Sequence, residues 1–401
     1  MNNHILFGCA GINSALLLNY CLWFVGASPV APWLCIPLVL FGFLYLSFCV
    51  FRHQLPLWPI PVFILVLLLI SLSTPAVAWD ARSIWLFHAK RIFLDENLFA
   101  QLDNYAPWSH NDYPVIIPAF SASLAGLVGL WNEIFPKVAN VVFLVVPIFL
   151  IGAVLRNVVS IIFFLVALLY VCSHYLHNGF LDANVAIILT SIVLISFEFQ
   201  KSDSRSHNLV AYILSTSLAV LCLLKNEGIL LSAIFLVLFF AYNYLYKIIK
   251  ISKILFISFL PFIFILTWKY YCFVYDVKND LVGSNLLSQA SSKFLDLDSV
   301  FTILDYVFSE VWVAAMLALA LIAIFYREHP FQKNIYFTIL FVLCYVFCIF
   351  TVYISTPQNL SWHLSTSASR ILMTVNVLSI AVLLYVAAIF FDKFKHKVSC
   401  I

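Results

Sequence analysis

Five short clusters of polar residues interrupt an otherwise apolar sequence. Each cluster contains side chains that can exchange a proton, bind a phosphate group or bind a cation. The clusters cover residues 79–95, 108–114, 174–182, 225–228 and 362–370. Any chemistry that the chain performs is therefore expected to involve these segments.

Asp80 opens the first cluster. The residues that follow, 82–95, have the pattern of an amphipathic helix, which would lie in the membrane interface and hold Asp80 at the depth of the lipid head groups. The expected apolar stripe is Trp85, Ala89, Ile92 and Phe93, and the expected polar face is His88, Arg91 and Asp95. Asp80 as a simple helix cap is the alternative, because Asp is a favoured N-cap residue.

Two further carboxylates stand beside histidines. Asp112 lies in the run His110, Asn111, Asp112, Tyr113, whose alternative interpretation is an interfacial turn with an aromatic anchor. Asp182 follows a pair of histidines that could help it to bind a cation, although an N-cap role explains it equally well.

Cationic side chains mark the last two clusters. Lys225 and Glu227 either pair with each other in a tight turn or pair with other groups. Arg370 follows Trp362 and His363 and is the basic residue of its loop, which suits a phosphate that its guanidinium can bind with two parallel hydrogen bonds. Snorkelling toward lipid head groups is the alternative for Arg370.

The composition indicates which class of protein holds these clusters in place. Of 401 residues, 64% are hydrophobic and 10% are charged, whereas a soluble domain is nearer half apolar and a quarter charged. The chain is therefore expected to be an all-α polytopic membrane protein. A net charge of +3, without a basic run interleaved with aromatics, argues against nucleic-acid binding. The ten cysteines show neither a CxxC pair nor a Cys/His cluster with zinc-ligand spacing, so free buried thiols are expected.

About twelve apolar stretches are long enough to cross a bilayer. They are 5–25, 32–51, 58–77, 137–154, 157–173, 182–199, 209–224, 228–246, 254–274, 306–326, 334–354 and 371–391. A thirteenth, 114–131, is short and carries Pro118. If it does not cross, the basic residues that flank the spans all lie on one side of the membrane; examples are Arg52, Arg156 and Arg327. This is the expected pattern, because cytoplasmic loops are rich in Lys and Arg. We therefore interpret 114–131 as a juxtamembrane or re-entrant helix and place both termini in the cytoplasm, with Asn104 and Ser365 outside.

The loops on the opposite side hold most of the acidic residues outside the spans. These loops are 78–136, 174–181, 275–305 and 355–370. A channel or transporter would usually keep its charges within the spans at mid-membrane depth. Charges at one membrane face instead favour chemistry on a lipid head group at the outer surface.

Several strings together resemble the GT-C glycosyltransferases, in particular family 39 and the aminoarabinose transferase of lipid A. The resemblance lies in Trp79 through Lys90, Asp112-Tyr113-Pro114, Asp182, Lys225 through Gly228, and Trp362-His363 to Arg370. It covers roughly 58–391, which predicts a catalytic domain there, with the loop 78–136 bearing juxtamembrane helices, an N-terminal hairpin extension at 1–57 and a cytoplasmic tail at 392–401. One departure is Ala81, which follows Asp80 where protein mannosyltransferases have Glu, so protein O-mannosylation is not expected.

The resemblance implies a specific reaction in the bacterial inner membrane. Such enzymes transfer a sugar from a polyprenyl phosphate to a periplasm-facing glycan or lipid acceptor, such as O-antigen or lipopolysaccharide. Asp80 would be the general base, and Asp112 and Asp182 are further catalytic candidates. The donor phosphate would be bound by four cationic side chains and a histidine, namely Arg370, Lys225, Lys90, Arg91 and His363. Sugar or acceptor contacts would come from Trp85, His110, Tyr113, Glu227 and Trp362. The charge on the leaving phosphate needs cationic side chains or a metal ion, and the choice stays open; if a divalent cation, Mg or Mn, binds, its ligands would be Asp80 and Asp182.

Two other membrane activities compete with this interpretation. A flippase for lipid-linked glycans predicts ionisable residues at mid-membrane depth on facing helices, which the spans nearly lack. An O-antigen polymerase or ligase predicts outer loops rich in arginine, whereas this chain places a carboxylate in its first large loop.

Overall fold

The computed structural model describes residues 2–28, 30–99, 107–199, 204–246, 250–277, 286–327, 329 and 331–398. Within these ranges the chain consists of helices joined by turns, without a strand, which confirms the expected all-helical class. Asn104, expected on the outer side, falls outside the described residues.

Seventeen α-helices follow one another along the described residues. They are α1 (Asn3–Phe24), α2 (Val30–Trp33), α3 (Cys35–Arg52), α4 (Pro59–Ser73), α5 (Leu86–Asp95), α6 (Ile116–Val128), α7 (Ala139–Leu155), α8 (Val158–Val171), α9 (Asp182–Glu198), α10 (Ser204–Cys222), α11 (Asn226–Tyr246), α12 (Ile251–Val274), α13 (Leu286–Leu295), α14 (Leu297–Phe308), α15 (Val311–Phe325), α16 (Gln332–Ser355) and α17 (Leu360–Val398).

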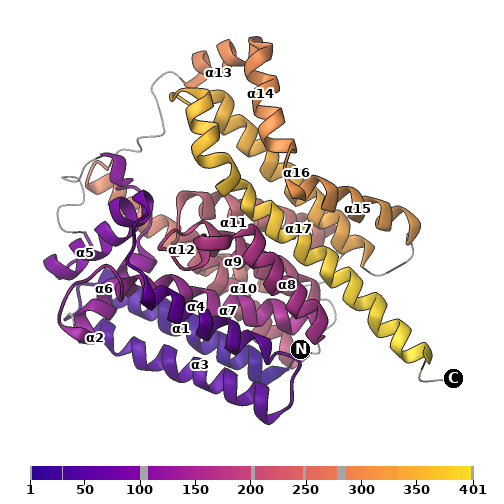
Figure 1. Cartoon of the computed structure of the whole chain (residues 1–401), viewed down its shortest axis with the longest axis horizontal. Helices are drawn as coiled ribbons and strands as arrows, with labels where there is room; N and C mark the ends of the chain where they lie inside the picture. Colours follow the sequence, from indigo (N-terminus) through magenta and orange to yellow (C-terminus); the bar gives the residue numbers. More distant parts are fainter. Residues whose placement is uncertain are drawn as a thin grey trace.

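Helix α9 is the centre of the bundle, because every one of its residues is buried. It contacts α7, α10, α11 and α17. The long helix α17 crosses the bundle obliquely (Figure 1). It contacts α14, α15 and α16, and α13 packs on α14 and α16; these helices lie away from α1 and α3. Helix α1 packs against α6, α7 and α10, so the leading hairpin shares the core of the bundle. The domain boundary near residue 57 stays a prediction.

Among the residues that the structure describes, seven helices are long and apolar enough to cross a membrane, or eight if one bent pair counts as a single span. Four shorter apolar helices are Pro59–Ser73, Ile116–Val128, Val158–Val171 and His207–Cys222. The total of twelve spans therefore stays a prediction. Helix α6, at 13 residues, is about 20 Å long and too short for a hydrocarbon core of about 30 Å.

The predicted span 306–326 covers α15 and the last residues of α14, and these two helices meet at an angle of 70°. A pair of hydrogen bonds accounts for the bend. The Asn376 side-chain amide donates to Glu310 at 3.0 Å and accepts from the backbone N–H of Trp312 at 2.9 Å. A polar residue of α17 thus binds the junction and the first turn of α15, where hydropathy alone predicted continuity.

The amphipathic segment after Asp80 forms a π-helix, Ala81–Trp85, continued by α5. Trp85, Ala89 and Ile92 are buried as expected, but His88 and Arg91 are buried too, which corrects their assignment to a polar face. Both find polar partners inside. The His88 ring lies 2.9 Å from the Ser109 carbonyl, and Arg91 donates to the carbonyls of Asn97 and Leu98 that follow the helix.

Candidate active site

Asp80 and Arg370 form an ion pair across 290 positions of sequence. Asp80 directly precedes the π-helix, and its side chain makes no capping hydrogen bond there, so the capping alternative does not describe it. Arg370 reaches it from α17, and the two side chains are only 23% and 19% exposed. The carboxylate is therefore held by a cation in a largely shielded position.

A second ion pair lies at the start of α9 and α11. Lys225 lies 2.9 Å from Asp182 and 3.6 Å from Glu227. Burial disfavours the charged form of Lys225, but the two carboxylates outweigh it and raise the pKa of its ammonium group. Asp182 also interacts electrostatically with Arg370, which joins the two pairs into one network of three carboxylates and two cations.

Glu227 is anchored on its other side by two hydroxyls. Tyr345 of α16 donates a hydrogen bond to it, and Thr374 of α17 does so at 3.5 Å. The turn that carries Glu227 is close-packed, because a Cβ atom at Gly228 would lie 2.0 Å from the carbonyl oxygen of Leu221. Glycine is therefore required at this position for α11 to start where it does.

Asn226 connects the ion pairs to a pocket. Its side-chain amide donates to the Asp112 carboxylate at 2.5 Å and its oxygen accepts from Lys269 at 3.1 Å. The indole of Trp268 fixes the loop by donating to the Asp112 backbone carbonyl at 2.9 Å.

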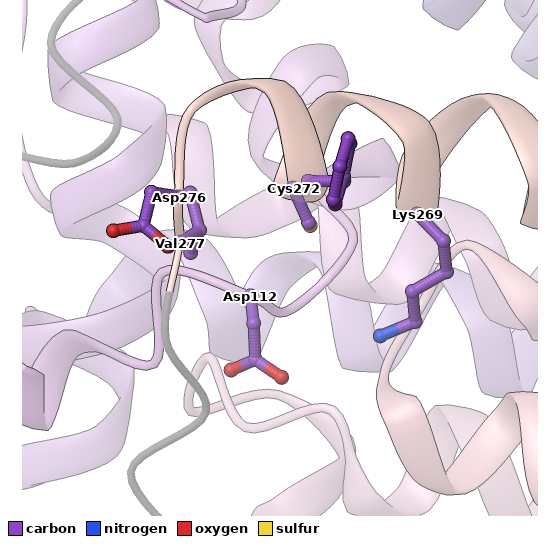
Figure 2. A pocket seen from close by; sticks show the side chains of 6 residues that line it. Asp112, Lys269, Cys272, Asp276 and Val277 are labelled. Carbon is purple, nitrogen blue, oxygen red and sulfur yellow. The ribbon is translucent and has the colours of Figure 1, made fainter.

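Asp112 and Lys269 line a cavity of about 300 Å³ with residues from the end of α12 (Figure 2). The remaining lining residues are Cys272, Phe273, Asp276 and Val277. The cavity thus combines two carboxylates with one ammonium group.

The three consecutive residues Lys225, Asn226 and Glu227 therefore form the centre of the site. Lys225 binds Asp182, Asn226 binds Asp112 and Lys269, and Glu227 binds Tyr345 and Thr374. All five clusters singled out in the sequence meet at this centre or through Arg370.

The predicted aromatic contacts form a stack at the side of the site. The Tyr113 ring lies between Trp85, at 5.7 Å, and His110, at 4.7 Å. Trp85 is buried by this packing, whereas Trp362 and Trp108 are 57% and 60% exposed.

Three predicted phosphate ligands have other surroundings. The His363 ring lies 2.8 Å from the hydroxyl of Thr356. The backbone carbonyl of Thr356 accepts a hydrogen bond from Lys293 at 2.5 Å. Lys90 is exposed on α5. Arg91 is engaged with the carbonyls after that helix. The structure therefore supports Arg370 and Lys225 as central cations more strongly than these three.

Sequence reasoning did not identify several residues of the site. Tyr345 and Thr374 lie within apolar helices, where nothing distinguishes a functional hydroxyl from a structural one. Lys269 is visible in the sequence as a charge near a span end, but not as a partner of Asn226. Lys137 is also buried, and its ammonium donates to the Thr74 carbonyl at 2.6 Å, which fixes the segment leading to Asp80.

No family model matches the sequence, and no curated protein matches it. Among solved structures, ArnT from Cupriavidus metallidurans bound to undecaprenyl phosphate is similar, with a TM-score of 0.51 over 81% of this chain at 15% sequence identity. The chain spans 58% of the length of that protein. The arrangement of helices is thus similar to that of ArnT.

Proposed function

We propose that this chain is a membrane glycosyltransferase that moves a sugar from a polyprenyl-phosphate donor to a glycan or lipid acceptor at the outer face of a bacterial inner membrane. The observation that carries the proposal is the network of Asp80, Arg370, Asp182, Lys225 and Glu227. It holds the partly shielded carboxylate of Asp80 beside the guanidinium of Arg370, within a helical arrangement similar to that of ArnT. The ArnT structure, which contains undecaprenyl phosphate, supports the choice of donor.

Asp80 would act as the general base. It would accept the proton of the acceptor hydroxyl while the hydroxyl oxygen bonds to the anomeric carbon of the sugar, and a positioned base typically contributes about 10²–10⁴-fold to the rate. The bond from that carbon to the phosphate oxygen breaks, and the polyprenyl phosphate leaves with the bonding electrons. Arg370 and Lys225 would stabilise the negative charge that develops on the leaving phosphate.

The ion pairs suggest an order of events. In the structure Arg370 is engaged by Asp80, so a donor phosphate must compete with this carboxylate for the guanidinium. A phosphate that binds Arg370 would release the Asp80 carboxylate from this ion pair and leave its oxygens free to accept the proton of the acceptor hydroxyl. Donor binding would thereby produce the active base.

A divalent cation at Asp80 and Asp182 stays part of the proposal. Each of these carboxylates is paired with a cationic side chain, so a metal ion would have to compete with Arg370 or Lys225. Activity measured with Mg, with Mn and with a chelator distinguishes the two ways of neutralising the phosphate.

The acceptor would be a cell-envelope glycan such as O-antigen or lipopolysaccharide. The test is mass spectrometry of surface glycans from a strain that lacks the gene and is complemented with variants. Wild-type protein should restore one added sugar per acceptor unit and Asp80→Asn should not. Asp95→Asn, at an exposed carboxylate that ends α5, is the matched control and should restore the sugar. Identical glycans with and without the gene would contradict the proposal.

A further inference from the structure

Two histidines and a cysteine meet where α1 begins and α3 ends. His4 lies in the first turn of α1, Cys49 in the last turns of α3, and His53 is the residue that caps α3. One ligand atom from each residue lies within 4.8 Å of the other two. His4 precedes Cys49 by 45 positions, so the spacing of these residues in the sequence does not show that their side chains meet.

The packing of the two helices explains the meeting. Helices α1 and α3 lie side by side at the edge of the bundle (Figure 1). A Cβ atom at Gly8 would lie 2.5 Å from the Leu46 side chain, so glycine lets the helices approach closely one turn from His4. Cys49 and His53 are four residues apart, which places both on the same side of the end of α3.

Tyr45 orients the cluster from within. Its hydroxyl lies 3.0 Å from Nδ1 of His4 and also interacts with the Cys49 thiol. The rings of His4 and His53 stack with centroids 5.0 Å apart and an angle of 15° between planes. A hydrogen bond to one ring nitrogen fixes the orientation of a histidine, as the outer partners of metal-bound histidines do.

We propose that His4, Cys49 and His53 bind a divalent transition metal ion of the zinc class. Two imidazoles and one thiolate are the donor set that zinc prefers among common ions. Bonds of about 2.0–2.3 Å in tetrahedral geometry require ligand atoms about 3.5 Å apart. The cluster therefore has to close by about 1 Å, and rotation of the exposed His4 and His53 side chains supplies this movement.

The ion would join the start of α1 to the end of α3. The other end of α1 is about 33 Å away, since it spans 22 residues. There Phe24 packs on Tyr271, two residues from Lys269 of the pocket. The metal site is therefore separate from the Asp80–Arg370 pair, and it would act on the stability of the hairpin. On the predicted topology this end faces the cytoplasm, where thiols stay reduced.

The test is zinc binding to the full-length protein, purified through a cleavable C-terminal tag without histidines. Wild-type protein should bind about one zinc ion per chain, and Co²⁺ in its place should show thiolate-to-cobalt charge-transfer absorption. Cys49→Ser and His53→Gln should each weaken zinc binding by at least about tenfold and remove that absorption or reduce it. Zinc should also raise the Tm of the wild type, because ligands that bind only the native state stabilise it.

Cys35→Ser is the matched control, because Cys35 is a buried thiol of the same helix at its other end. It should bind zinc as the wild type does. Tyr45→Phe should weaken binding by about 10- to 100-fold, as expected for an outer partner of a metal-bound histidine. Equal zinc affinity in the Cys49→Ser and Cys35→Ser proteins, or no stoichiometric zinc in the wild type, would overturn the proposal. If Cys49→Ser does not fold, His53→Gln decides, because His53 is exposed.

Discussion

Replacing Lys225 by Met should destabilise the protein more than replacing its partner Asp182 by Asn. The substitution leaves Asp182, 4% exposed, without its nearest cation, and Glu227 loses the same partner. Removing one member of a buried pair costs about 3–5 kcal/mol. Because Arg370 still acts on Asp182, we expect the lower end of that range, about 3 kcal/mol.

Asp182→Asn should cost less, about 1–2 kcal/mol, because Lys225 keeps Glu227 at 3.6 Å. The double variant should be more stable than the sum of the single costs predicts, with a coupling of about 1–3 kcal/mol. The assay is reversible unfolding in mixed detergent micelles for all four proteins. Lys90→Met, at an exposed position, is the control and should unfold as the wild type does. A Lys225→Met protein as stable as Lys90→Met, or a coupling of zero, would show that the two charges do not depend on each other.

Three further changes follow from individual contacts. Burial holds the pKa of His88 at about 4, below its ordinary 6.5. Protonation of this imidazole therefore favours the unfolded chain. The free energy of unfolding should be highest above about pH 6.5 and about 2 kcal/mol lower at pH 5. His88→Gln should remove this decline in unfolding measurements between pH 5 and 8, and an unchanged decline would point to another group. Arg370→Lys keeps the charge but loses the planar guanidinium, so the KM for a lipid-linked donor should rise about tenfold, and an unchanged KM would remove Arg370 from donor binding. Tyr345→Phe removes a donor from buried Glu227 and should lower the unfolding free energy by about 1–3 kcal/mol. No change would mean that Thr374 and Lys225 satisfy this carboxylate without Tyr345.

Hydropathy predicts most of the helices because the bilayer imposes one simple requirement, an apolar segment of sufficient length. Helices such as α1, α7 and α16 fall close to their predicted stretches. Hydropathy did not predict the bend between α14 and α15, where a side chain from a distant helix, Asn376, binds the junction. The sequence contains no local signal for a contact between positions 66 residues apart.

The candidate site, like the fold, could be predicted only in part from the sequence. Asp80, Asp182, Lys225 and Arg370 could be identified singly, because charged residues near a membrane face are few. Which carboxylate pairs with which cation could not be predicted, since the pairing depends on how α9, α11 and α17 meet. The meeting of His4, Cys49 and His53 could not be predicted for the same reason.

The most direct measurement of the central claim is the release of polyprenyl phosphate by purified protein from a monophosphate-linked polyprenyl sugar in the presence of acceptor. Asp80→Asn keeps the size of the side chain and a hydrogen-bonding oxygen for Arg370 but cannot accept a proton at neutral pH. The account predicts turnover by the wild type, a loss of about 10²–10⁴-fold in Asp80→Asn, and donor binding and Tm that remain similar in both. A folded Asp80→Asn protein with near-normal turnover, or wild-type transfer from a nucleotide sugar without any lipid carrier, would contradict it.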